Sequence, residues 1–333
     1  MKILVTGGAG FIGSNFIRLM LSERPDWEIV NLDKLTYAAN LENLRDVESD
    51  ARYRFIQGDI CDREAVAKAL DGCDAIVNFA AETHVDRSIM EPMAFLRTDV
   101  EGTFVLLEAV RDGKAGRLLQ VSTDEVYGSI SKGAVDEHAP LRPSSPYSAS
   151  KAGGDLLCLS YWNTYETSVV ITHGANNIGP YQYPEKVLPL FVTNALDEIS
   201  LPLYGDGLQV RDYTHVEDHC RGILLALEEG APGEVYNVGA GNEMQNIDMA
   251  RFLLAELGKP ESLIQHVKDR PGHDRRYAID SGKLRALGWA PRYDATEALR
   301  ATIRWYAENR WWWEPIKSGE HYREYYRQQY EER

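Results

Sequence analysis

The sequence has few of the features that mark secreted, membrane-bound or metal-stabilised proteins. Only 4 of its 333 residues are cysteines, none stands in a C-x-x-C pair, and no histidine lies at zinc-ligand spacing from one, so we expect reduced thiols and no metal site. No apolar run approaches the roughly 20 residues that a membrane helix needs, so we expect no membrane contact. The segment Met1–Thr6 lacks a basic stretch followed by an apolar one, and we expect a cytoplasmic location.

Positive charge is also scarce, since the formal net charge is −15. A general nucleic-acid binder needs a basic face, so that class of function is disfavoured. The acidity leaves room for a small anionic ligand, because such a ligand needs only a few local Arg or Lys groups and a helix N-terminus. A length of 333 residues suits one large domain or two coupled ones.

Short apolar runs alternate with helical patterns in the first half of the chain. Such runs, rich in Val, Ile and Leu, are typical of parallel strands buried on both faces. The alternation predicts βαβ units and an α/β fold, a Rossmann doubly wound parallel sheet. The predicted strands are 2–6, 28–32, 53–56, 75–79, 117–122 and 168–172, and the predicted helices are 13–23, 62–70, 92–111 and 147–166.

Proline and glycine become frequent after residue 173, which predicts a change of architecture. We expect an NAD-binding Rossmann domain at 1–173 and a smaller C-terminal substrate-binding lobe at 174–333, with segments that can interleave with the first domain. Aromatic side chains crowd the last part of the chain, 305–333, where we expect them to pack the end of the fold or a subunit contact. Predicted strands here are 208–214 and 234–238, and predicted helices are 185–197, 216–229, 246–257 and 294–309.

A glycine-rich turn directly follows the first predicted strand and opens a helix. The string Gly7–Gly13 fits G-x-G-x-x-G, whose glycines let the backbone approach a pyrophosphate at a helix N-terminus. Asp33 ends the second strand, 20 residues after Gly13, where a carboxylate accepts hydrogen bonds from ribose hydroxyls and favours NAD over NADP; its alternative is a cap or turn residue. The adjacent Lys34 weakens this expected preference for NAD over NADP. Asp59 and Ile60 close the third strand, where adenine would lie.

A Tyr-x-x-x-Lys pair, Tyr147 and Lys151, lies on one face of a predicted helix. The ammonium and a nicotinamide cation would lower the tyrosine pKa, so that the phenolate takes a proton from a substrate alcohol as hydride leaves. Thr123 ends the fifth strand and completes the triad of a short-chain dehydrogenase/reductase. The alternative is a pair of surface residues on an amphipathic helix.

Two adjacent carboxyl groups, Asp124 and Glu125, follow Thr123 directly. In a partly buried site, mutual repulsion raises one pKa, so one group can act as an acid while the other acts as a base. The alternative is that both cap the following turn.

Five segments together resemble the dTDP-glucose 4,6-dehydratase family of the extended short-chain dehydrogenase/reductases: Thr6–Ser14, Ser122–Gly128, Ser144–Ala152, Asn176–Pro180 and Asp269–Tyr277. The resemblance implies dehydration of dTDP-glucose to dTDP-4-keto-6-deoxyglucose by C4 oxidation, water elimination across C5 and C6, and C6 reduction, with a retained NAD and a homodimer. It implies that Tyr147 takes the proton of the C4 hydroxyl, that Glu125 removes the proton of C5, and that Asp124 protonates the departing C6 hydroxyl. Open alternatives are a UDP-sugar 4-epimerase, a dehydratase of another nucleoside-diphosphate sugar, and a catalytically silent NAD-binding regulator.

The same resemblance implies two sets of ligand contacts. NAD would contact Gly7, Gly10, Phe11, Ile12, Gly13, Asp33, Lys34, Leu35, Thr36, Asp59, Ile60, Phe79, Ala80, Ala81, Glu82, Thr83, Thr98, Tyr147, Lys151 and Asn177. The sugar nucleotide would contact Thr83, His84, Thr123, Asn176, Lys186, Val187, Pro202, Leu203, Tyr204, Arg211, Asn246, Asp269, Arg270, Pro271, Gly272 and His273. Taken alone, Lys186, Arg211 and Arg270 read as solvated surface charges. Ile178 and the pair Tyr213-Thr214 depart from the family pattern, which puts the substrate preference in question.

Overall fold

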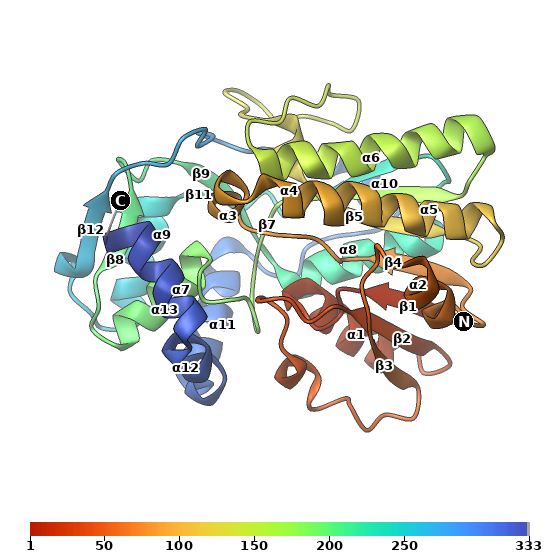
Figure 1. The fold of residues 1–333 in the computed structure, drawn as a ribbon. Coiled ribbons are helices and arrows are strands. Elements are labelled where there is room, and N and C mark those ends of the chain that lie inside the picture. The colour runs from red at the N-terminus through yellow and green to blue at the C-terminus, as the bar shows by residue number, and fades with distance from the viewer. Residues whose placement is uncertain (332–333) are drawn as a thin grey trace.

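A seven-stranded parallel sheet forms the centre of the larger lobe in the computed structural model, which describes residues 1–331 (Figure 1). The strand order is β10-β6-β5-β4-β1-β2-β3, a doubly wound arrangement. The fold class is therefore confirmed. The strands are β1 (Lys2–Thr6), β2 (Glu28–Asp33), β3 (Tyr53–Gln57), β4 (Ala75–Asn78), β5 (Leu118–Thr123), β6 (Val169–Gly174) and β10 (Val235–Val238).

Helices cover both faces of this sheet, because alternate side chains of each buried strand point to opposite faces. Ile3 and Val5 pack against α1 (Phe11–Glu23), α8 (Val216–Glu229) and α10 (Gly282–Ala286). Leu4 belongs to the other core layer, whose helices are α2 (Arg63–Ala69), α5 (Thr103–Arg111) and α6 (Pro146–Tyr165). Before α5, the chain is already helical in α4 (Pro92–Phe95) and in the π-helical η2 (Leu96–Gly102).

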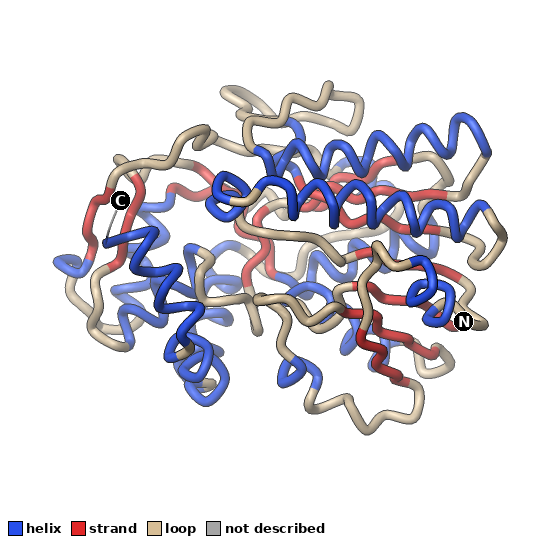
Figure 2. Tube along the Cα trace, in the orientation of Figure 1, coloured by secondary structure: helices blue, strands red, loops and turns tan. Residues whose placement is uncertain are grey.

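The smaller lobe lies beyond the carboxyl ends of the central strands and has a core of its own (Figures 1 and 2). Its strands are β7 (Asn176–Ile178), β9 (Val210–His215) and β11 (Glu243–Gln245) in one small sheet, and β8 (Leu201–Tyr204) and β12 (Ile264–Val267) in another. Its helices are α7 (Val187–Leu196), α9 (Asn246–Glu256), α11 (Ala295–Glu308), α12 (Arg310–Ser318) and α13 (Glu320–Tyr326), followed by η5 (Arg327–Glu331). Short helical turns elsewhere are η1 (Leu41–Leu44), α3 (Val85–Met90), η3 (Asp124–Tyr127) and η4 (Glu261–Leu263).

All the strands and helices predicted from the sequence are present, with ends that differ by a few residues. The predicted helix 92–111 is one helical run whose middle turn is π-helical. The sequence did not predict α3, the short strands of the smaller lobe other than β9, or the C-terminal helices. β10 and α8 come from the chain after residue 173 and yet complete the larger lobe, which is the kind of interleaving that we expected. The boundary at residue 173 itself stays a prediction. Within residues 1–331, no helix is long and apolar enough to cross a membrane.

Trp313 anchors the core of the smaller lobe. Its side chain is 1% exposed, and its indole nitrogen donates a hydrogen bond to the Tyr306 carbonyl at 2.8 Å. We expect Trp313→Ala to lower the free energy of unfolding by about 3–5 kcal/mol, because it leaves a large cavity. Trp311→Ala is the control, since Trp311 is 48% exposed, and it should change that free energy by about 0.5 kcal/mol or less. Urea denaturation measures both; equal effects would contradict this view of the core.

Candidate active site

The turn between β1 and α1 is shaped to receive a phosphate group. Gly7 has φ +68°, and a Cβ atom there would lie 2.6 Å from the Ala80 backbone nitrogen. A Cβ atom on Gly13 would lie 2.5 Å from the Gly7 carbonyl oxygen, so both positions require glycine. Gly10 precedes α1 without a side-chain cap, which leaves the first-turn amides for an anion. This turn fits the pyrophosphate of NAD.

Asp33 lies at the end of β2, at the edge of the same turn. Its carboxylate accepts hydrogen bonds from the backbone N–H groups of Ala9 at 2.9 Å and Leu35 at 2.8 Å. Burial raises the pKa of Asp33, and these two hydrogen bonds oppose the shift. Lys34 forms an ion pair with Asp59 at 2.8 Å. The ammonium that was expected to weaken the preference for NAD over NADP is therefore already paired with a carboxylate.

Asp33→Asn tests the ribose contact. An amide offers one acceptor oxygen and no charge, so we expect NAD to bind about tenfold or more weakly. The measurement is the fraction of NAD that stays with the protein through gel filtration. Asp46→Asn is the matched control, because Asp46 pairs with Arg18 on the exposed surface. Equal retention of NAD by both variants would remove Asp33 from the cofactor site.

One cavity runs from the glycine turn to Tyr147. It is lined by most of the residues predicted to contact NAD, namely Gly7, Gly10, Phe11, Ile12, Gly13, Asp33, Lys34, Thr36, Asp59, Ile60, Phe79, Ala80, Ala81, Glu82, Thr83, Thr98, Tyr147 and Lys151. Leu35 does not line it, and Asn177 lines the neighbouring cavity instead. Val121, Gln182 and Tyr183, which gave no signal in the sequence, also line this cavity. Among residues 1–331, no cluster of side chains could hold a metal ion.

The predicted catalytic side chains lie where the end of β5 adjoins α6. Tyr147 and Lys151 lie one helical turn apart on α6, and the Lys151 ammonium donates to the Val121 carbonyl at 2.8 Å. Burial raises the pKa of Tyr147 well above its ordinary value, and the charges of Glu125 and Asp99 add to the shift, while a hydrogen bond with Thr123 opposes it. The expected lowering of this pKa involves Lys151 together with a nicotinamide cation, so it stays a prediction for the protein with its cofactor bound.

Asp124 and Glu125 occupy different environments although they are adjacent. Asp124 is 3% exposed, and its Oδ2 atom has no hydrogen-bond partner in the protein. Burial first, and the charge of Glu125 second, raise the pKa of Asp124 well above its usual value. Glu125 lines a second cavity, where the Tyr277 hydroxyl donates to its carboxylate at 3.3 Å. The predicted split into a protonated acid and an accessible base fits this geometry.

The second cavity adjoins the first, and Gln182 and Lys186 line both. It brings together the predicted sugar-nucleotide contacts His84, Asn176, Lys186, Val187, Pro202, Leu203, Tyr204, Arg211, Asn246, Arg270 and His273. Thr83 lines the first cavity, while Thr123, Asp269, Pro271 and Gly272 line neither. The Lys186 ammonium donates a hydrogen bond to the Thr83 hydroxyl at 3.0 Å. Because Lys186 lines both cavities, a cation lies where they meet.

The three cations of this cavity are not surface charges. Arg211 is 5% exposed and stacks over the Tyr277 ring at 4.3 Å, and Arg270 has a side chain only 12% exposed. The alternative reading as solvated surface charges is wrong for Arg211 and Arg270, because both side chains are largely buried in the structure. The Nε atom of Arg270 has no hydrogen-bond partner in the protein, which suits a group that receives an anionic ligand.

Several lining residues gave little or no signal in the sequence. Glu185, 2% exposed, holds Arg87 through hydrogen bonds of 2.9 and 3.0 Å. Tyr277 ends a segment that the resemblance had marked. Tyr330 belongs to the aromatic tail that was expected to pack the end of the fold or a subunit contact, and it lines the second cavity. Ile178 and Tyr213, the two departures from the family pattern, line this cavity as well.

Comparisons with known proteins agree with this geometry. The model of the family described as GDP-mannose 4,6 dehydratase matches residues 4–302. A dTDP-glucose 4,6-dehydratase of Streptomyces niveus is 50% identical over 96% of this chain and 96% of its own. A dTDP-glucose 4,6-dehydratase of Shigella flexneri is 46% identical over the full length of both.

Solved structures separate two kinds of relative. The dTDP-glucose 4,6-dehydratase DesIV of Streptomyces venezuelae, solved with NAD bound, has a TM-score of 0.93 and 52% identity, covering 95% of this chain and 100% of its own. A UDP-glucuronic acid 4-epimerase of Bacillus cereus, also solved with NAD, has a TM-score of 0.87 and 29% identity, covering 92% of this chain and 99% of its own. The fold is common to both, whereas the sequence is far closer to the dehydratase. By its family model and its near full-length relatives, this chain belongs to the GDP-mannose 4,6 dehydratase family, among the dTDP-glucose 4,6-dehydratases.

Proposed function

We propose that this chain is a carbon–oxygen lyase that dehydrates dTDP-glucose to dTDP-4-keto-6-deoxyglucose. The observation that carries the proposal is the carboxyl pair Asp124 and Glu125 beside Tyr147. Tyr147 lines the first cavity and Glu125 the second, while Asp124 is buried behind them and lines neither. An oxidising triad beside an acid–base pair is what a sequence of oxidation, elimination and reduction requires. Bound NAD supplies a hydride acceptor for C4 and a hydride donor for C6, so the reaction has no net redox change.

The residues of the chain move the protons. Tyr147 takes the proton of the C4 hydroxyl, with Thr123 at the same oxygen and Lys151 beside the phenol. The C4 ketone acidifies C5, and Glu125, which faces the cavity, takes the C5 proton. Asp124 keeps its own proton because it is buried, and it protonates the C6 hydroxyl that leaves as water. Glu125 then returns a proton to C5. The proton that Tyr147 took balances the one that Asp124 gave, and exchange with solvent restores both groups before the next turnover.

Charged and aromatic groups hold the nucleotide part. Arg211 and Arg270 are the guanidinium groups that receive the diphosphate, because fork-shaped donors match phosphate oxygens. Tyr204 and His273 line the same cavity, with ring centroids 5.9 Å apart, and their rings pack against the nucleotide base. The Tyr213 hydroxyl donates to Asn246 at 2.8 Å, so this departure from the family pattern fixes a predicted substrate contact.

The substrate assignment is tested by offering dTDP-glucose, UDP-glucose and GDP-mannose to the purified protein without added NAD. We expect a 4-keto-6-deoxy product from dTDP-glucose. A product from a different nucleotide alone would overturn the base preference, and a C4 epimer would favour the epimerase. A chain that binds NAD and converts none of the three would favour the regulator.

We also propose a cytoplasmic homodimer joined through helices of the larger lobe. Large apolar side chains lie exposed on α3, α4, η2 and α6, namely Met90, Met93, Leu96 and Leu156. These elements pack against one another in the larger lobe, and exposed apolar side chains of this kind are typical of contact surfaces. Light scattering should give twice the chain mass of 37.6 kDa, and the mass of one chain would contradict the dimer.

A further inference from the structure

The C-terminal segment, defined here as α13 with η5, reaches the second cavity from the far end of the chain. Tyr322, Tyr325 and Gln329 are buried, with exposed fractions of 4%, 5% and 6%. The Tyr322 hydroxyl donates to the Pro184 carbonyl at 3.1 Å, next to Glu185. The segment therefore packs on residues that line the cavity, although the mechanism above assigns it nothing.

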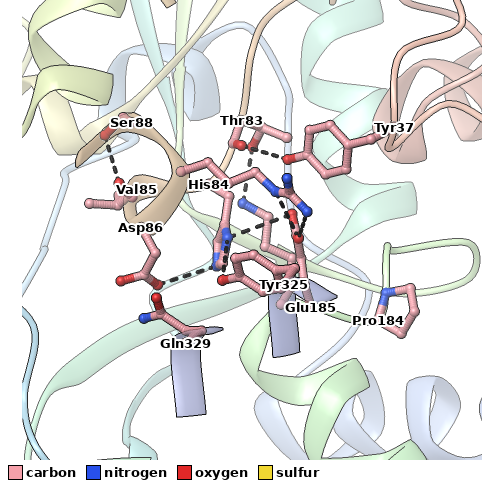
Figure 3. Close-up of polar contacts among 12 residues, drawn as sticks. Tyr37, Thr83, His84, Val85, Asp86, Ser88, Pro184, Glu185, Tyr325 and Gln329 are labelled. Atoms are coloured by element: carbon pink, nitrogen blue, oxygen red, sulfur yellow. Dashed lines mark hydrogen bonds and ion pairs between the residues drawn. The ribbon is translucent and has the colours of Figure 1, made fainter. Parts of the chain in front are cut away.

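The contact of greatest interest joins Tyr325 to His84. The Tyr325 hydroxyl lies 3.1 Å from Nδ1 of His84, and Nε2 of His84 lies 3.5 Å from an Asp86 carboxylate oxygen (Figure 3). Burial and the charges of Lys186, Arg270 and Arg87 lower the pKa of His84 well below its usual value, so the ring is neutral. A neutral ring fits these contacts when Nε2 carries the hydrogen toward Asp86 and Nδ1 accepts from Tyr325.

His84 needs such a hold because its backbone is strained. Its φ is +89°, in a region that a side chain rarely adopts, and it sits between Thr83 and α3. Thr83 is fixed in turn by Tyr37, whose hydroxyl donates to the Thr83 carbonyl at 2.8 Å (Figure 3). The Lys186 ammonium donates to the Thr83 hydroxyl as well. The Arg87 guanidinium stacks 4.4 Å over the Tyr325 ring, which ties the two segments together.

The other end of the C-terminal segment lies against Tyr204. Gln329 donates a hydrogen bond to the Tyr204 hydroxyl, and the ring centroids of Tyr330 and Tyr204 lie 6.0 Å apart. Tyr204 and Tyr330 both line the second cavity. The segment thus touches the cavity at two places, the strained His84 and the ring assigned to the base.

We propose that the C-terminal segment is one wall of the sugar-nucleotide site, in which Tyr325 is a positioning residue that holds His84 and Tyr330 is a contact for the nucleotide base. The inference rests on the proposed function for the identity of the ligand. Tyr325 acts on the sugar end, because His84 adjoins Thr83 at the junction with the cofactor cavity. Tyr330 acts on the nucleotide end, beside Tyr204.

The test compares Tyr325→Phe with Tyr326→Phe in the NAD-loaded enzyme. Both variants lose one hydroxyl from the same helix, but the Tyr326 hydroxyl accepts from Asn194 on α7, outside both cavities. For Tyr325→Phe we expect kcat to fall about tenfold with KM within about twofold, because the sugar loses its fixed neighbour while the nucleotide contacts remain. Tyr326→Phe should keep both constants.

A double-variant cycle with His84→Gln separates positioning from plain stability. If Tyr325 works through His84, adding Tyr325→Phe to His84→Gln should lower kcat by less than about twofold further. Additive losses, or equal constants for Tyr325→Phe and Tyr326→Phe, would overturn the positioning role. The assay uses whichever sugar nucleotide the wild type converts, so a wrong substrate assignment is seen in the wild type and not mistaken for a failure of this inference.

The second readout is equilibrium binding of dTDP, which does not depend on turnover. We expect Tyr330→Leu to weaken dTDP binding about fivefold, through the loss of a ring contact, while Tyr325→Phe leaves it within about twofold. Unchanged dTDP binding in Tyr330→Leu would remove the C-terminal segment from the base end of the site. Thermal unfolding of each variant, measured alongside, shows that a folded protein was tested.

Discussion

Tyr147→Phe should lower the rate of dehydration by about 10³-fold or more while leaving NAD bound. A positioned general base contributes about 10²–10⁴-fold to a rate, and the loss of the phenol oxygen also removes the partner of the substrate hydroxyl. The measurement is product formation from dTDP-glucose, with NAD content determined on the same sample. Tyr165→Phe is the matched control, because Tyr165 lies on the same helix and is 51% exposed.

The enclosure of Tyr147 makes this prediction sharper. In the protein by itself, burial and the nearby carboxylates keep the phenol protonated. A positive nicotinamide ring in the adjoining cavity acts in the opposite direction, so the base becomes available when the oxidised cofactor is present. If Tyr147→Phe turned over at the rate of Tyr165→Phe, the triad would have no part in the reaction.

Glu125→Gln and Asp124→Asn should each lower the rate of dehydration by about 10²–10³-fold, but they should stop the reaction at different steps. Glutamine cannot take the C5 proton, so Glu125→Gln should oxidise C4 without exchanging the C5 hydrogen. Asparagine cannot supply a proton to the leaving hydroxyl, so Asp124→Asn should still exchange that hydrogen. Neither change alters the size of the side chain, so both variants should fold.

The measurement for this pair is made on substrate recovered from D₂O. We expect deuterium at C5 of the recovered dTDP-glucose with Asp124→Asn and none with Glu125→Gln. The reverse pattern would exchange the two roles. Normal dehydration by both variants would mean that the carboxyl groups only cap the turn η3.

The sequence alone marked most of the residues that line the first cavity, because their signals are local. The turn Gly7–Gly13 and the residue Asp33 stand at strand ends that can be read from short apolar runs, and the position of a parallel strand fixes where its last residue lies. The Tyr147 and Lys151 pair follows from helical spacing alone. The parallel sheet brings these residues together in one cavity, which Gln182, Tyr183 and Lys186 from later in the chain also line.

The substrate half was harder because distant segments build it. β8 pairs with β12, whose residues come about 60 positions later, and neither strand has a clear local pattern. The cations Arg211 and Arg270 look like surface charges until the chain folds over them. Tyr325 and Tyr330 look like packing aromatics, and only the tertiary fold places them against His84 and Tyr204.

The central claim is that oxidation at C4, elimination and reduction at C6 take place in one pocket with one retained cofactor. The most direct measurement follows the hydrogen of C4 in dTDP-glucose that carries deuterium there. The account predicts that the deuterium appears at C6 of the 4-keto-6-deoxy product. Deuterium that stays at C4 of an epimerised sugar, or that is lost to solvent or to free cofactor, would contradict it.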